Sequence, residues 1–186
     1  MVIAIIVIVV LLVVLALVVI GVNNTMIGAR NRVDESWSGI DVQLKRRHDL
    51  VPNLVETVKG YATHEREVFE KVTAARAEAT KAHTPAEAAQ KEGQLTQALT
   101  DLRAVAENYP DLRATENFQK LQNELTEIED EIQASRRIYN SNVQAYNTKI
   151  QVFPNSVIAN SRGFTAREFF EIEDAGDREP VQVSFS

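Results

Sequence analysis

The sequence predicts an all-α protein: an N-terminal transmembrane helix, then an antiparallel bundle of long helices with an extended C-terminal tail. The first residues form an uninterrupted aliphatic run. After it, apolar residues recur at alternating steps of four and three, the spacing of helices that pack along one face. Only 7 Gly and 5 Pro occur in 186 residues, which disfavours a strand-and-turn architecture. We divide the chain into an anchor (1–22), a helical bundle (23–155) and a C-terminal tail (156–186).

The aliphatic run extends from Val2 to Val22 and contains no charged or polar side chain. A helix of this length rises by roughly 30 Å, the thickness of the hydrocarbon core of a bilayer. The run lacks the basic start and the small-residue cleavage site of a secretory signal, so we expect a retained membrane anchor. The alternative, a buried helix of a soluble domain, normally shows a polar face.

The net charge and the composition indicate the orientation in the membrane and exclude some classes of partner and site. Arg30 and Arg32 follow the anchor, so the positive-inside rule predicts a bundle that faces the cytoplasm. The net charge of -6 argues against nucleic acid as a partner, because phosphate neutralisation needs a basic face. The chain has no Cys, and therefore no disulfide, thiol nucleophile or thiolate metal site.

The first bundle helix is predicted by an apolar stripe that begins at Val33. Its members are Val33, Trp37, Ile40, Leu44, Val51, Leu54, Val58 and Tyr61, and later Val68, Val72 and Ala75. Arg47 and Glu65 are exceptions on this stripe. Pro52 interrupts it; because proline removes one helical hydrogen bond and crowds the carbonyl of His48, we expect a kink or short break there.

A second helix is predicted from its start signal. Thr84 can cap it, Pro85 suits the first helical position, and Glu87 completes a capping box. The helix that follows has a thin apolar stripe, formed by Leu95, Leu99, Leu102 and Ala106. The run Asn108-Tyr109-Pro110-Asp111 stops it.

A third helix should begin near Thr115 and close at Phe153-Pro154-Asn155. Its stripe consists of Phe118, Leu121, Leu125, Ile128, Ile132, Tyr139, Val143, Tyr146, Ile150 and Phe153. Beyond it, residues 166–171 are expected to form a helical turn. Residues 181–185 alternate like a strand that docks in a groove of its own bundle or adds to another chain.

No catalytic or metal site is predicted. His48, His64 and His83 have spacings that fit no metal site. A helix face with Glu124, Glu127 and Glu131 lacks the Glu-x-x-His pair of di-iron bundles, and a solvated acidic face is the better interpretation. We therefore expect a protein without enzymatic activity and without a cofactor.

Polar residues within or beside the apolar stripes are the remaining candidates. They are Arg46, Arg47, Asp49 and Asn53 around Pro52, and Arg136, Arg137, Asn140, Asn142 and Asn147 in the third helix. They can pair across helices and fix the register, or extend to solvent over apolar neighbours. A third interpretation is a recognition surface for a partner.

Four segments resemble the LemA family: RRHDLVPNLVETVKGYATHE (46–65), ARAEA (75–79), YPDLRATENFQKLQNEL (109–125) and SRRIYNSNVQAYNTKIQVFPN (135–155). The resemblance runs from about Val33 to the closing EPVQVSF. The resemblance implies an N-terminal membrane helix, an antiparallel bundle in the bacterial cytoplasm, no established enzymatic activity, and in one branch an association with magnetosome membrane compartments. Arg162-Gly163-Phe164 departs from it, because many relatives carry an aromatic residue before the glycine. The interaction candidates within these motifs are Arg46, Arg47, Asp49, Pro52, Asn53, Arg136, Arg137, Tyr139, Asn140, Tyr146, Asn147, Phe153 and Pro154.

The function expected from the sequence is a single-pass protein of the bacterial inner membrane that self-assembles as a scaffold or membrane-organising module. The alternative is an adaptor or regulator of a membrane protease or other membrane protein, which would bind through residues 46–53. The small residues of the anchor (Ala4, Ala16 and Gly21) form no small-xxx-small pattern. We therefore expect the bundle to direct homo-oligomerisation at the bilayer surface.

Overall fold

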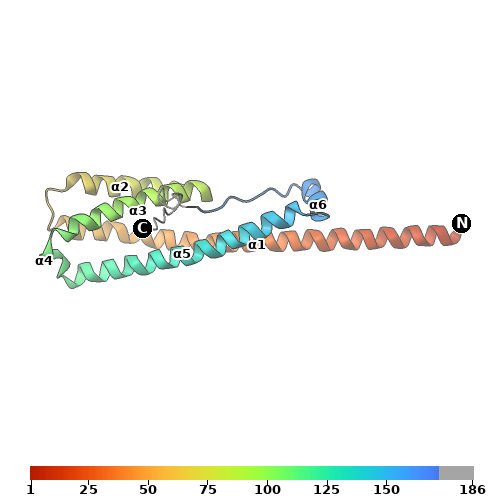
Figure 1. Cartoon of the computed structure of the whole chain (residues 1–186), viewed down its shortest axis with the longest axis horizontal. Helices are drawn as coiled ribbons and strands as arrows, with labels where there is room; N and C mark the ends of the chain where they lie inside the picture. Colours follow the sequence, from red (N-terminus) through yellow and green to blue (C-terminus); the bar gives the residue numbers. More distant parts are fainter. Residues whose placement is uncertain (172–186) are drawn as a thin grey trace, which may run out of the picture. The chain divides into compact units, whose positions relative to one another are not determined.

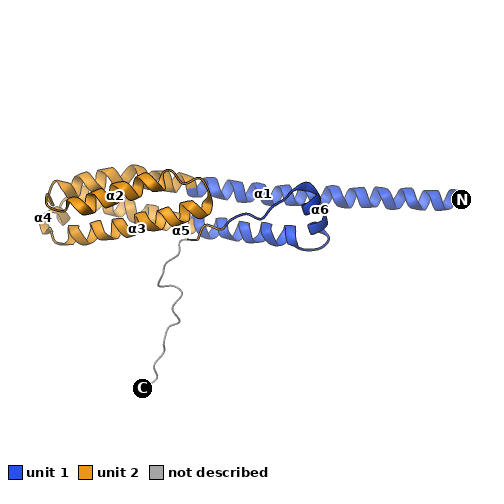
Figure 2. Cartoon of the chain, turned by 90° about the horizontal axis from the view of Figure 1, so that it is seen from above, with its two compact units in different colours: residues 1–40, 135–168 blue, residues 41–134, 169–186 orange. Residues whose placement is uncertain are grey.

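The computed structural model describes residues 1–171, in which six helices and no strand occur (Figure 1). The all-α prediction is confirmed. The helices are α1 (Val2–Lys59), α2 (Arg66–Ala79), α3 (Pro85–Glu107), α4 (Pro110–Arg113), α5 (Glu116–Gln151) and α6 (Asn155–Arg162). They form two compact units: of the described residues, unit 1 holds 1–40 and 135–168, and unit 2 holds 41–134 and 169–171 (Figure 2).

The first part of α1 is long and apolar enough to cross a membrane. Its most apolar 18-residue window has a mean hydropathy of 3.9, and none of that window is buried against protein. Burial along α1 begins only at Met26 and Ala29. Within unit 1 the apolar run therefore continues into the packed part of α1 without a linker.

In unit 1, α1 and α5 run antiparallel. The ring centroids of Trp37 and Tyr139 lie 5.4 Å apart, and the side-chain amide of Asn142 donates to the carbonyl of Arg32 at 3.4 Å. Residue numbers rise along α5 as they fall along α1, so this pairing sets the register. The buried apolar residues of this unit include Met26, Ala29, Val33, Ile40, Tyr139, Val143, Tyr146, Ile150 and Ala159.

Unit 2 is a helical bundle. It consists of the C-terminal part of α1 (residues 41–59), the whole of α2 and α3, and the N-terminal part of α5 (residues 116–134), and the short α4 lies in the connection between α3 and α5. Antiparallel α2 and α3 are joined by ion pairs from Lys71 to Asp101 and from Lys91 to Glu78. The core of the unit includes Leu44, Leu54, Val58, Val72, Leu95, Leu102, Leu112, Phe118, Ile128 and Ile132. Its packing follows the predicted stripes on α1, α3 and α5, whereas α2 buries Phe69, Val72 and Ala79, and Val68 and Ala75 of the predicted stripe are half-buried.

The predicted start of α3 is confirmed. The Thr84 hydroxyl accepts from the backbone N–H of Glu87 at 3.2 Å, and the Glu87 carboxylate accepts from the N–H of His83 at 3.0 Å. The stop signal also acts as predicted, because α3 ends at Glu107.

The predicted apolar stripes are also wrong at the C-terminal ends of α1 and α5. Tyr61 is 46% exposed and Phe153 is 82% exposed, because α1 already ends at Lys59 and α5 at Gln151. Of the kink or short break expected at Pro52, the break is absent, since α1 passes through this residue as continuous helix, and the kink stays a prediction.

The tail differs from its prediction as well. Its short helix is α6, at Asn155–Arg162, and residues 166–171 are not helical. Pro154 precedes the first residue of α6, and Gly163 ends it with φ of 71°, a left-handed conformation that favours glycine. The strand-like residues 181–185 lie outside the described residues.

Burial gives a first testable prediction. Tyr139 is 1% exposed and Phe118 is 6% exposed. Replacing either residue by Ala should lower the free energy of unfolding by about 3–5 kcal/mol. Tyr139→Phe, which removes only a hydroxyl hydrogen bond, should cost about 0.5–1.5 kcal/mol. The measurement is denaturant unfolding of the full chain in detergent, followed by circular dichroism.

The control for this experiment is Phe153→Ala. Because this ring is 82% exposed, the unfolding midpoint should hardly move. Unchanged midpoints for both Tyr139→Ala and Phe118→Ala would contradict the packing described above.

Candidate functional site

A buried polar cluster lies at the centre of unit 2, around Arg47. This residue occupies the apolar stripe of α1 and is only 1% exposed. Its Nη1 donates to Oε2 of Glu92 at 3.0 Å, and its Nη2 donates to Oγ1 of Thr96 at 2.7 Å. Nη2 also lies 3.0 Å from Oε1 of Glu129. One guanidinium therefore joins α1, α3 and α5.

Glu92 is the anionic partner that sequence reasoning missed. It is 1% exposed, and its second carboxylate oxygen accepts a hydrogen bond from Nε2 of His48 at 2.6 Å. A signal was present, because Glu92 falls on the four-and-three spacing that runs through Ala88, Leu95 and Leu99. A charge on the stripe of α3 is the complement of the Arg47 exception on the stripe of α1.

The electrostatics of this cluster are those of a desolvated ion pair. Burial raises the pKa of Glu129, and the nearby Arg47 guanidinium opposes that rise. Among the described residues, Nε of Arg47 has no hydrogen-bond partner. Such pairs contribute little net stability, but removing one partner typically costs about 3–5 kcal/mol because it strands a buried charge. The cluster therefore favours one register of the helices over its alternatives.

The absence of a break at Pro52 has a specific cause. Proline has no backbone N–H, so the carbonyl of His48, four residues earlier, loses its helical donor. Nε of Arg76, on α2, donates to that carbonyl at 2.6 Å. A side chain from the neighbouring helix thus replaces the missing backbone donor. Pro52 and Arg76 are coupled through one oxygen atom.

The other predicted residues around Pro52 face outward. Arg46, Asp49 and Asn53 are exposed, and their steps of three and four place them on one side of α1. Nη1 of Arg46 donates to the amide oxygen of Gln43 at 3.1 Å. These residues form a polar outer row, separate from the buried Arg47.

In unit 1, three side chains of α5 hold an extended segment that we call the strap (residues 164–168). The Tyr139 hydroxyl donates to the carbonyl of Glu168 at 2.8 Å, and the Tyr146 hydroxyl donates to that of Thr165 at 2.9 Å. Asn147 binds both backbone groups of Arg167: its amide nitrogen donates to the carbonyl at 2.9 Å, and its amide oxygen accepts from the N–H at 2.8 Å.

This arrangement explains why the expected helical turn does not form. The strap's backbone groups bond to side chains of α5, as they would to a neighbouring strand, and are not available for helical bonds. Burial raises the pKa of Tyr139 to about 12, so its phenol keeps the proton that it donates. Two contacts with α1 complete the strap: Arg167 with Asp34 at 2.8 Å, and Arg30 over the Phe164 ring at 5.6 Å.

The remaining predicted residues are less enclosed. Arg136 and Asn140 are half-buried on α5, and Arg137 is exposed. Phe153 and Pro154 are exposed in the turn between α5 and α6. Their assignment as interaction residues stays a prediction.

The described residues contain no group of three or more His, Asp or Glu side chains that could hold a metal ion. The buried charged or polar side chains among the described residues, Arg47, His48 and Glu92, bond to one another between α1 and α3, and only Nε of Arg47 is left without a partner. The fold and these two clusters define a helical-bundle protein with one N-terminal helix able to span a membrane.

Comparison with known proteins supplies the family. The family model described as LemA family matches residues 36–185, so the chain belongs to the LemA family. Magnetosome protein MamQ 2 of Paramagnetospirillum magneticum is 27% identical over 180 residues, covering 83% of this chain and 66% of that protein. Protein LemA of Metamycoplasma hominis is 27% identical over 143 residues, covering 76% of this chain and 65% of that protein. The chain thus spans slightly less than two thirds of these curated relatives.

The Pro52–Arg76 pair gives a second prediction. Arg76→Met should cost about 1–3 kcal/mol of unfolding free energy, because the carbonyl of His48 then lacks a donor. In a Pro52→Ala background the restored backbone N–H takes over, so the same change should cost clearly less. Pro52→Ala alone should keep the helical content. Equal costs of Arg76→Met in both backgrounds of this double-mutant cycle would show that the two residues are independent.

The strap gives a third prediction. Asn147→Ala removes two hydrogen bonds to Arg167, so local opening should become easier by about 1–2 kcal/mol, and amide exchange at Arg167 roughly ten-fold faster. Hydrogen exchange read by mass spectrometry measures this. Gln144→Ala, an exposed change on the same helix, is the control and should leave the exchange unchanged. Protection that survives Asn147→Ala would assign the docking to other contacts.

Proposed function

We propose that this LemA-family chain is a single-pass protein of the bacterial inner membrane that assembles with further copies as a membrane-organising scaffold and performs no catalysis. The observation that carries the proposal is the uninterrupted passage of α1 from its exposed apolar run into the packed core of unit 1. A helix without a linker transmits the direction of the span to the packed residues of the same unit.

This continuity favours lateral assembly. Copies inserted in one membrane share the same polarity, and confinement to a surface raises their effective concentration, so weak contacts between bundles can add up. The span itself lacks a small-xxx-small pattern, which argues against a dedicated dimer of anchors. Contacts between bundles are therefore the proposed source of specificity.

The distribution of charge supports the proposed orientation. Unit 1 carries seven Lys and Arg against three Asp and Glu, a net charge of +4. The rest of the sequence carries thirteen Lys and Arg against twenty-three Asp and Glu, a net charge of -10. The unit that contains the span is thus the basic one, and basic residues near a span favour the cytoplasmic side.

The relatives agree with a structural role. Those from Paramagnetospirillum magneticum and Magnetospirillum gryphiswaldense are named as magnetosome proteins, after a structure rather than a reaction. Because this chain spans only part of their length, their names support the class of role and not a particular partner.

A second candidate function is an adaptor for a membrane protease or another membrane protein. The outer row of Arg46, Asp49 and Asn53 favours it, because these side chains are exposed on one side of α1. A photo-crosslinker at Asp49 distinguishes the two functions. An adaptor yields one heterologous product there, whereas a scaffold yields crosslinks between copies of this chain.

The fourth prediction tests assembly directly. Full-length protein in mild detergent should grow in mass with concentration, because the anchors align weakly associating bundles. A variant lacking residues 1–24 should be smaller at equal concentration. The measurement is size-exclusion chromatography with light scattering.

The matched control replaces residues 2–22 by an unrelated Leu- and Ala-rich span. Assembly should persist, because the bundle and not the span provides specificity. If the full-length protein stays monomeric over a hundred-fold range of concentration, the scaffold proposal fails and the adaptor takes its place.

A further inference from the structure

An apolar patch lies at the turn between α5 and α6. Val152 is 45% exposed, Phe153 82% and Val157 62%, and all three fall within six residues of sequence. Among residues 23–171, the other large apolar residues that are exposed are Val42, Tyr61 and Ile138, which are separated in sequence. A phenylalanine this exposed beside two further aliphatic side chains needs a partner surface, because apolar groups gain free energy on leaving water.

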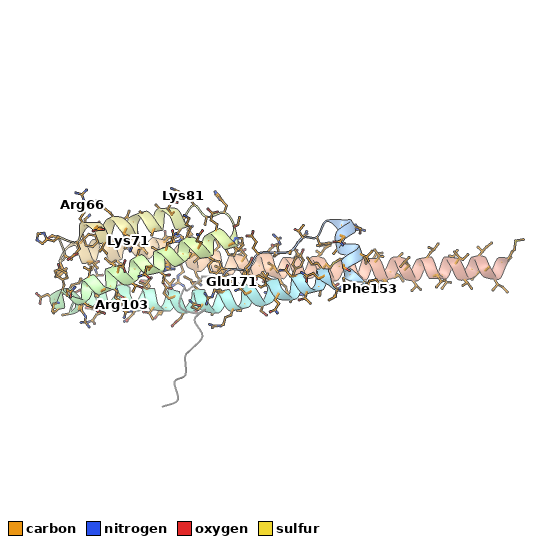
Figure 3. The ribbon with its side chains drawn as sticks, turned by 45° about the horizontal axis from the view of Figure 1, so that its top comes forward. Arg66, Lys71, Lys81, Arg103, Phe153 and Glu171 are labelled. Atoms are coloured by element: carbon orange, nitrogen blue, oxygen red, sulfur yellow. The ribbon has the colours of Figure 1, made fainter. Side chains whose placement is uncertain are left out.

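The register of unit 1 places this patch at the end of the membrane span. Tyr139 packs on Trp37, and Asn142 reaches the carbonyl of Arg32. Since the two helices are antiparallel, following α5 to Phe153 leads back along α1 to about residue 21, where the aliphatic run ends. Figure 3 shows Phe153 at this end of α5, and α6 lies beside α1 in all three views.

The charges around the patch match a phospholipid surface. Residues 132–167 contain no Asp or Glu, and five Lys and Arg. Lys149 precedes the patch by three residues and Arg162 follows it by five. Anionic headgroups attract such side chains, and an aromatic ring with aliphatic neighbours is the composition that inserts at the boundary of headgroups and acyl chains.

A second copy of the chain fits the patch less well. A stable protein interface buries about 800 Å² on each partner, more than three side chains on one turn provide. A bilayer needs no complementary shape, and the span of the same unit already brings it to this level.

We infer that the α5–α6 turn is a second membrane contact of unit 1. The side chains of Val152, Phe153 and Val157 enter the leaflet at the C-terminal end of the span, and Lys149 and Arg162 lie against anionic phosphate groups. Two points of contact then fix how unit 1 is tilted and rotated on the bilayer, which the span alone leaves free.

The test uses full-length protein in nanodiscs. Because the chain has no Cys, one introduced thiol carries a fluorophore without side reactions. The probe is placed by Val157→Cys, and the matched control by Ile138→Cys, since these positions are 62% and 60% exposed on helices of the same unit. Leu11→Cys, 62% exposed within the span, reports insertion of the anchor.

Lipids that carry a nitroxide near the top of the acyl chain should quench the fluorophore at 157 at least two-fold more than the fluorophore at 138. Iodide in the aqueous phase should instead quench the fluorophore at 138 more strongly than the one at 157. Charge reversal by Lys149→Glu with Arg162→Glu should reduce the lipid quenching at 157 in discs rich in anionic lipid. The same two changes should have little effect in zwitterionic discs.

Two results overturn the inference while the span remains inserted. Equal iodide quenching at 157 and 138, with no lipid quenching at either, means that the turn stays in water. Protection from both quenchers at 157 means that protein covers it, and assigns the patch to contact between copies. If nitroxide lipids do not quench the fluorophore at Leu11→Cys, the anchor is not inserted. That result contradicts both the proposed membrane span and the proposed contact of the turn.

Discussion

The ion pair between Arg47 and Glu92 is the constraint on which the packing of unit 2 depends. Both side chains occupy apolar stripes and are 1% exposed, so each needs the other. Heptad stripes are degenerate, because a slip of one heptad again sets apolar residues against apolar residues. Such a slip would separate Arg47 from Glu92 and strand two buried charges, at a cost far above that of a few displaced apolar contacts. The pair specifies the register that the stripes alone leave open.

Much of the fold could be predicted because its signals are local. The capping box at Thr84, the stop before Pro110 and the spacing of the stripes depend on residues within one or two helical turns. Arg47 was recognisable as an exception for the same reason. Its partner was harder to find, since the stripe of α3 is thin and Glu92 stands near its start. Arg76 could not be assigned from the sequence at all, because its acceptor is a carbonyl on another helix.

In the tail, by contrast, tertiary contacts decide the conformation more than local sequence signals do. α6 was not predicted, although Pro154 and Gly163 flank it, and the expected turn at residues 166–171 was overridden by tertiary contacts. Asn147 is the decisive residue, because a single side-chain amide satisfies both backbone groups of Arg167. The polar residues of α5 thus have a role that stripe analysis does not assign: they replace the strand that an extended segment would otherwise need.

In the proposed membrane arrangement, the two units have different physical tasks. Unit 1 combines the apolar span, a net charge of +4 and the exposed α5–α6 turn, all properties that suit contact with lipid. Unit 2 buries Arg47 and Glu92 among its own helices. For lateral assembly, each copy must present the same face to its neighbours. A span alone permits rotation about the membrane normal, so a second lipid contact in unit 1 removes a freedom that weak contacts between bundles would otherwise have to overcome.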